Sequence, residues 1–89
     1  MNIKIKLIGS INRIAGVKNL ILTVQNKIKI HDVLNLLSEK VPNLKSYLVN
    51  PIPRFLILIN GVDIKNINGL DTQIPEDSEI TFLSITHGG

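Results

Sequence analysis

Hydrophobic and polar residues alternate at the start of the chain. In NIKIKLI, residues 2–8, every second residue is aliphatic and lysines occupy two of the positions between them. A period of two places the apolar side chains on one face of a strand, so we predict a half-buried strand here. NLILTVQN, residues 19–26, is rich in branched residues and predicts a second strand, hairpin-paired with the first. INRIAG, residues 11–16, predicts a short turn or a single helical turn between them.

The hydrophobic period changes to three or four in IHDVLNLLSEKVPNL. The apolar stripe consists of Ile30, Val33, Leu34, Leu37 and Val41. This spacing predicts an amphipathic helix over residues 31–41, which Pro42 ends and over whose end Leu44 folds back. No Ser, Thr, Asp or Asn stands at the expected capping position, but Asp32 in the first turn faces the positive end of the helix dipole.

The second half of the chain returns to strand patterns. FLILI, residues 55–59, is apolar on both faces, which predicts a central strand or one whose second face meets a partner. A turn follows at Asn60-Gly61, then a polar connection, then EITFLSIT, residues 79–86, as the last strand. The order β-β-α-β-β predicts an α+β fold with a mixed sheet of four or five strands packed on one main helix.

Composition excludes several classes of protein. A chain of 89 residues is short enough to form one domain over residues 1–89, and 44% hydrophobic residues exclude intrinsic disorder. The longest apolar run, residues 55–59, is far shorter than the ~20 residues of a membrane helix, and the opening residues lack a signal-peptide pattern. The absence of cysteine excludes disulfides and zinc-thiolate sites. We expect a cytoplasmic monomer with no membrane partner.

Charge is distributed unevenly. Residues 1–54 hold nine Lys/Arg against two acids, and residues 55–89 hold one against five, giving +7 and −4. A basic half is one mark of nucleic-acid binding. Here the lysines are scattered singly, and the only rings that can stack on a base are Tyr47, Phe55 and Phe82. Solvated faces of a small fold explain the pattern better, so we expect no direct nucleic-acid binding.

Catalytic and metal-binding patterns are weak. The two histidines, His31 and His87, are single and distant in sequence, without the spacing of a metal site. The acids Glu76, Asp77 and Glu79 lie in one turn, where a solvated corner is the simpler explanation. No glycine-rich phosphate loop follows a strand. We therefore predict no catalytic residues, no metal ligands and no bound cofactor.

The chain ends in THGG, directly after a strand pattern. One explanation is a frayed terminus. Another is that the carboxylate of Gly89 reacts after a separate enzyme activates it with ATP and Mg²⁺, most simply as an acyl-adenylate. Residues 86–89 in extended form span roughly 13 Å, enough to thread a narrow channel. Two glycines leave that channel and the carbonyl unobstructed, so we predict a flexible tail at residues 87–89.

These features resemble the ubiquitin-like β-grasp sulfur carriers, most of all the ubiquitin-related modifier family. LILING followed by GLDTQIPEDSEITFLSITHGG is similar to that family's ending: a Leu-Asp pair, an acidic turn, a Phe-containing strand and His-Gly-Gly. The small subunit of molybdopterin synthase and the thiamine sulfur carrier share the Gly-Gly end. Molybdopterin-type tails more often carry a Phe-Pro-Pro-like stretch, which LSITHGG lacks, but NRIAG resembles their RELAG-like element.

The resemblance implies a β-grasp fold and roles for the tail residues. By this resemblance, Gly89 would be the residue that a partner enzyme adenylates and that becomes a thiocarboxylate. A sulfur donor or thiotransferase supplies the sulfur, which in the modifier family goes to tRNA wobble uridine. By the same resemblance, the terminal glycine would also form isopeptide bonds with lysines of target proteins. Gly88 would give clearance, and His87 would be a spacer or partner contact.

The apolar strands are expected to include a docking surface for these partners, on whichever alternate set faces outward. The candidate contacts are Phe82, Leu83, Ile85, Phe55, Ile57 and Ile59. Two other functions stay open: the small subunit of molybdopterin synthase, with its tail inserted into a large subunit, and a β-grasp interaction module whose Gly-Gly does not react.

Overall fold

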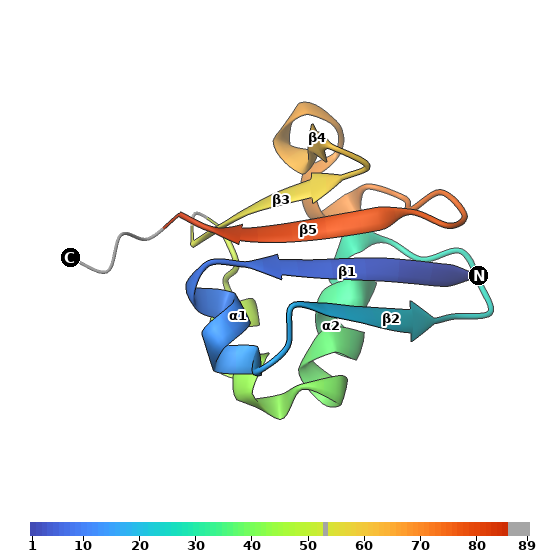
Figure 1. The fold of residues 1–89 in the computed structure, drawn as a ribbon. Helices are drawn as coiled ribbons and strands as arrows, with labels where there is room; N and C mark the ends of the chain where they lie inside the picture. Colours follow the sequence, from blue (N-terminus) through green and yellow to red (C-terminus); the bar gives the residue numbers. More distant parts are fainter. Residues whose placement is uncertain (53, 86–89) are drawn as a thin grey trace.

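A computed structural model of the chain describes residues 1–52 and 54–85 (Figure 1). Within these residues the chain forms five strands, three α-helices and three 3₁₀ helices (η). In chain order they are β1 (Asn2–Ile8), α1 (Ser10–Ala15), β2 (Asn19–Thr23), α2 (Ile30–Lys40), η1 (Pro42–Leu44), α3 (Lys45–Leu48), β3 (Phe55–Ile59), β4 (Val62–Asp63), η2 (Ile64–Asn66), η3 (Gly69–Asp71) and β5 (Glu79–Ser84).

The five strands form one mixed sheet in the order β2-β1-β5-β3-β4. The first and last strands, β1 and β5, lie side by side in parallel at its centre, while β1–β2, β3–β5 and β3–β4 are antiparallel. Figure 1 shows α2 crossing behind the sheet and α1 packed at the end where β5 finishes. The predicted α+β fold class, with a mixed sheet on one main helix and β1 hairpin-paired with β2, is confirmed. The short strand β4 brings the number of strands from four to five.

Helix α2 covers one face of the sheet through its apolar stripe. Ile30, Val33 and Leu37 are completely buried, as the spacing predicts. The helix begins at Ile30, where the Asp32 carboxylate accepts the backbone N–H of the preceding residue at 2.9 Å. It ends at Lys40, because Pro42 cannot continue it and starts η1 instead. The predicted return of Leu44 over the helix end is confirmed by its complete burial.

The entry into β5 is fixed by the turn between β3 and β4. Asn60 and Gly61 both have positive φ, 49° and 85°, as a tight hairpin turn requires. The Asn60 side chain accepts the Glu79 N–H at 2.9 Å and donates to the Ser78 hydroxyl at 3.3 Å. Ser78, which is fully buried, donates in turn to the carbonyl of Pro75 at 2.6 Å. These bonds hold the first residue of β5 beside the end of β3.

Alternation within the strands separates a core face from an open face. On β1 the burial pattern alternates strictly, with Ile3, Ile5 and Leu7 inward and the lysines and Ile8 outward. The two phenylalanines meet in the core edge-to-face, with ring centroids 6.4 Å apart. In residues 1–52 and 54–85, no helix is both long and apolar enough to cross a membrane.

Candidate functional site

The last two residues of β5 and the residue after them, 83–85, are held from both sides; we call this segment the β5 exit. Leu83 pairs with Ile8 of β1 and Leu56 of β3, and Ser84 pairs with Phe55. The N–H of Ile85 then donates to the carbonyl of Arg54 at 3.3 Å, one residue beyond the ladder. The chain therefore leaves the sheet from a fixed point between two neighbouring strands.

A third contact to the β5 exit comes from α1. The hydroxyl of Ser84 accepts the backbone N–H of Ile11 at 3.0 Å. The residue before α1, Gly9, has no side chain to cap this helix, so Ser84 satisfies one of its free N–H groups from a distant strand. Gly9 has φ +92°, and a Cβ placed there would lie 3.0 Å from the Cβ of Ser84. Glycine thus permits the close approach of α1 to the β5 exit.

Five apolar side chains lie at or near the β5 exit on the open face, and we call them the tail-side patch. They are Ile8, Leu56, Leu58, Leu83 and Ile85. Ile8 and Ile85 are 44% and 41% exposed, and the three leucines are half-buried. Residues directly opposite one another in paired strands point to the same face, so Ile8, Leu83 and Leu56 form a continuous row across three strands.

The structure corrects part of the predicted docking surface. Phe55, Ile57, Ile59 and Phe82 are at most 5% exposed and belong to the core under α2. They face inward because Ile57 pairs with Phe82, and Phe82 lies on the same side of β5 as the fully buried Ile80. A buried side chain cannot meet a partner, so these four residues are removed from the candidate surface.

The other predicted contacts keep their place, and three residues join them. Leu83 and Ile85 lie on the outward set, and their contact with a partner stays a prediction. Sequence reasoning missed Ile8, Leu56 and Leu58. The available signal was that β3 is apolar on both faces, so its second set had to face outward or meet a partner. His87, Gly88 and Gly89 lie outside the described residues, and their roles stay predictions.

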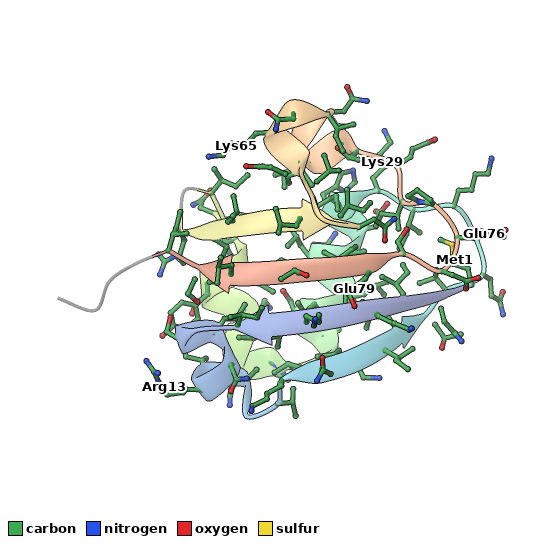
Figure 2. All side chains as sticks on the ribbon, turned by 45° about the horizontal axis from the view of Figure 1, so that its top comes forward. Met1, Arg13, Lys29, Lys65, Glu76 and Glu79 are labelled. Atoms are coloured by element: carbon green, nitrogen blue, oxygen red, sulfur yellow. The ribbon has the colours of Figure 1, made fainter. Side chains whose placement is uncertain are left out.

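Groups that could perform catalysis are not gathered among the described residues. His31 lies 3.4 Å from a carboxylate oxygen of Asp32 and 3.9 Å from one of Asp71, but its side chain is 47% exposed. Over residues 1–52 and 54–85, no group of three or more His, Asp or Glu side chains is placed to hold a metal ion. Glu76 and Asp77 are exposed in the turn before β5. Figure 2 shows Glu76 beside Met1, at the end of the sheet opposite Arg13 and the β5 exit.

Comparison with known proteins identifies a family that the sequence matches. The sequence model of the ThiS family matches residues 5–89. No curated protein matches the sequence. The fold is similar to the solution structure of small archaeal modifier protein 1 from Methanosarcina acetivorans, with 31% identity, a TM-score of 0.79, and coverage of 99% of this chain and 96% of that one.

Two further solved structures share the fold at lower identity. Urm1 from Trypanosoma brucei is 22% identical with a TM-score of 0.77, covering 99% of this chain and 95% of that one. A chain in the complex of subunits 1 and 2 of the molybdopterin-converting factor from Helicobacter pylori is 17% identical with a TM-score of 0.62, covering both chains completely.

Proposed function

This chain belongs to the ThiS family of ubiquitin-like sulfur carriers, and we propose that it carries sulfur on the carboxylate of Gly89. Small carriers of this family are not enzymes themselves and are activated by partner enzymes. The observation that carries the proposal is that the family match runs from residue 5 to residue 89, so that it includes both glycines. We also propose that residues 1–89 form one carrier domain with a reactive tail.

The chemistry begins with activation of a poor electrophile. A carboxylate oxygen of Gly89 attacks the α-phosphorus of ATP, pyrophosphate leaves, and an acyl-adenylate forms in the active site of a partner enzyme that holds Mg²⁺. The sulfur of a donor persulfide then attacks the acyl carbon and AMP leaves. A thiol cleaves the resulting acyl disulfide by attacking the donor's sulfur, and the thiocarboxylate remains on Gly89. The partners supply every catalytic group for this series of reactions.

The β5 exit supports this use of the tail. Three hydrogen-bonded or paired neighbours fix the point where residues 86–89 begin, and four extended residues reach roughly 13 Å from it. A partner that takes up those residues lies against the tail-side patch. We propose that this patch docks the activating enzyme, because apolar side chains beside the tail are covered in the same encounter.

Sulfur transfer is the proposed default outcome, with tRNA thiolation as its destination. The acyl-adenylate can be attacked by a persulfide or by an amine. A free lysine has a pKa of about 10.4 and is mostly protonated near neutral pH, whereas a persulfide is largely ionised. Isopeptide bonds from Gly89 to lysines of target proteins therefore form where a lysine with a lowered pKa is presented. The similarity to small archaeal modifier protein 1 supports keeping both outcomes.

The test uses the purified protein with its activating enzyme, ATP and a persulfide donor. Intact-mass spectrometry should show one oxygen replaced by sulfur, and peptide mapping should place the change on Gly89. If neither this mass change nor a crosslink from Gly89 to lysine is observed, the function is that of the non-reacting interaction module. The chain without Gly88 and Gly89 serves as the negative control and should accept no AMP.

Docking on the tail-side patch has a matched pair of variants. Ile8 in the patch and Ile67, between η2 and η3, are both 44% exposed. Ile8→Asp should raise the KM of the activating enzyme for this protein by about tenfold, the effect of about 1.4 kcal/mol of lost binding, while Ile67→Asp should change it less than twofold. Equal effects of the two variants would remove the patch from the docking surface.

The small subunit of molybdopterin synthase is the second candidate function. The segment NRIAG, which includes the end of α1, resembles the corresponding element of those subunits, and the Helicobacter pylori complex contains a chain of the same fold. The activation chemistry is the same and only the acceptor of the sulfur differs. One experiment distinguishes the two functions. The thiocarboxylated protein is offered separately to a tRNA-thiolation enzyme with its tRNA and to a molybdopterin synthase large subunit with its precursor.

A further inference from the structure

Strand β2 forms one outer edge of the sheet, and within the described part of the chain no strand pairs with its outward side. Hydrogen bonds from Leu7 N–H to the Lys18 carbonyl and from Val24 N–H to the Met1 carbonyl, at 2.8 and 3.0 Å, bracket the β1–β2 ladder. In an antiparallel ladder every second residue turns its N–H and C=O toward the partner strand. Lys18 and Val24 belong to the alternate set of residues that faces β1. The other set, which consists of Asn19, Ile21 and Thr23, therefore turns its N–H and C=O groups outward. We call this side of the strand the β2 edge.

Two hollows lie side by side beneath the β2 edge, between β2 and the α2 side of the molecule. One of about 410 Å³ is lined by Leu20 together with Val17 and Val41. The other, of about 290 Å³, is lined by Leu22 together with Leu36. Leu20 and Leu22 are two residues apart, which is the spacing of consecutive side chains on one face of a strand. A strand added to the β2 edge would thus place alternate side chains over the two hollows.

Lys40, at the end of α2, stands between the two hollows and lines both. Its Nζ lies 3.5 Å from the Ile21 carbonyl oxygen, one of the outward groups of the β2 edge. A lysine on a strand edge is a device by which proteins prevent edges from pairing with one another. An incoming strand must move this ammonium group aside, and a carboxylate on that strand would bind it once it has moved.

The surroundings of the β2 edge are basic. Exposed lysines occur at positions 4, 6 and 18, besides Lys40, and the acids that line the same hollows and the neighbouring open face are Glu39 and Glu79. Both ion pairs among the described residues involve His31, so these lysines have no carboxylate partner there. A second copy of this chain would bring the same lysines together and offers no acid on its own β2, NLILT. The charge favours an acidic partner instead.

We propose that the β2 edge binds an extended acidic segment of a partner protein by strand addition. Its backbone pairs with the outward groups of Asn19, Ile21 and Thr23, alternate apolar side chains fill the two hollows, and a carboxylate takes Lys40 away from the Ile21 carbonyl. This site lies on the outer strand and needs neither the tail nor its activation. A partner protein with such a segment therefore binds the carrier whatever the state of Gly89.

A blocked synthetic peptide, EEVIVVDD, tests the site on the full-length ¹⁵N-labelled protein, with KKVIVVKK as its charge-reversed control. The acidic peptide should shift the amide resonances of Asn19, Ile21 and Thr23 and slow their hydrogen exchange. It should bind at least about tenfold more tightly than the basic peptide, because only the acidic one matches the lysines.

A matched pair of charge reversals locates the effect. Lys40→Glu should weaken binding of the acidic peptide about tenfold or more and strengthen binding of the basic one, since the partner charge is reversed. Lys65→Glu makes the same change near the opposite edge of the sheet, beyond β4 (Figure 2), and should alter neither affinity more than twofold. Ile21→Pro removes an outward N–H that the β1 ladder does not use, and should abolish binding.

Several results would overturn the proposal. They are equal binding of the two peptides, resonance shifts confined to the tail-side patch, Lys40→Glu behaving like Lys65→Glu, or concentration-dependent self-association through the β2 edge without peptide binding. If Ile21→Pro fails to fold, the Lys40→Glu result decides. Adenylation of Lys40→Glu by the activating enzyme should match that of the unchanged protein, so failure here and failure of the carrier function are separable.

Discussion

Replacing Ser84 with alanine isolates the hydrogen bond between the β5 exit and α1. The change removes only the hydroxyl oxygen that accepts the Ile11 N–H at 3.0 Å and keeps the Cβ that packs against Gly9. Loss of a capping side chain typically costs about 1 kcal/mol, and a buried N–H left without a partner costs about 1–3 kcal/mol. The Ile11 side chain is fully buried, which limits access of water to this helix end. We expect Ser84→Ala to lower the free energy of unfolding by about 1.5 kcal/mol.

Urea denaturation measures this change. With a slope of about 1 kcal/mol per molar urea, as expected for a small domain, the midpoint should fall by about 1.5 M with the slope unchanged. Ser46→Ala, at an exposed position of α3, is the control and should stay within about 0.5 kcal/mol. Native-state hydrogen exchange should show the Ile11 amide exchanging faster by more than the loss of global stability explains. If Ser84→Ala and Ser46→Ala behave alike, the hydroxyl does not cap α1.

Three further predictions concern the core, the tail and the β3–β4 turn. Leu37→Ala should lower stability by about 2–5 kcal/mol in urea denaturation because Leu37 is fully buried, and a loss under about 0.5 kcal/mol would contradict its place in the core. Deleting Gly88 and Gly89 should leave the unfolding midpoint within about 0.5 kcal/mol, since glycine buries no side chain, while adenylation measured by AMP incorporation disappears; a truncated chain that still accepts AMP would refute this. Asn60→Ala should cost about 1–2 kcal/mol in thermal unfolding, because it strains a positive φ and frees the Glu79 N–H, and Asn60→Gly should recover part of that loss.

Local patterns predicted the elements of this fold closely. The helix predicted over residues 31–41 is α2 at Ile30–Lys40, because the apolar period and Pro42 act within the segment itself. Its start was less clear, since the carboxylate that helps to cap it comes from Asp32, inside the first turn. The strand predicted over residues 19–26 ends at Thr23, where pairing with β1 runs out. Strand ends depend on the partner strand, which the segment's own sequence does not contain.

Non-local contacts account for what the sequence did not show. Helix α1 was predicted only as a short turn or a single helical turn, and the side chain that caps it, Ser84, is 73 residues away in sequence from Ile11. The prediction of the docking surface was limited for the same reason. Strand β3 is apolar on both faces, so its pattern alone gives no direction, and the pairing of Ile57 with Phe82 decides which set enters the core. Phe82 was therefore predicted as a contact and is a core residue.

The central position of β5 also constrains how the protein folds. Because β5 lies between β1 and β3, a chain still lacking it has two separate hairpins, β1–β2 and β3–β4, with no sheet joining them. Contacts between residues this far apart in sequence slow folding, and they form only after the ribosome has released the last strand. Maturation is thereby coupled to synthesis of β5: nascent chains, and chains truncated before β5, present neither a finished sheet nor a fixed β5 exit. An activating enzyme that docks on the tail-side patch would thus select folded molecules.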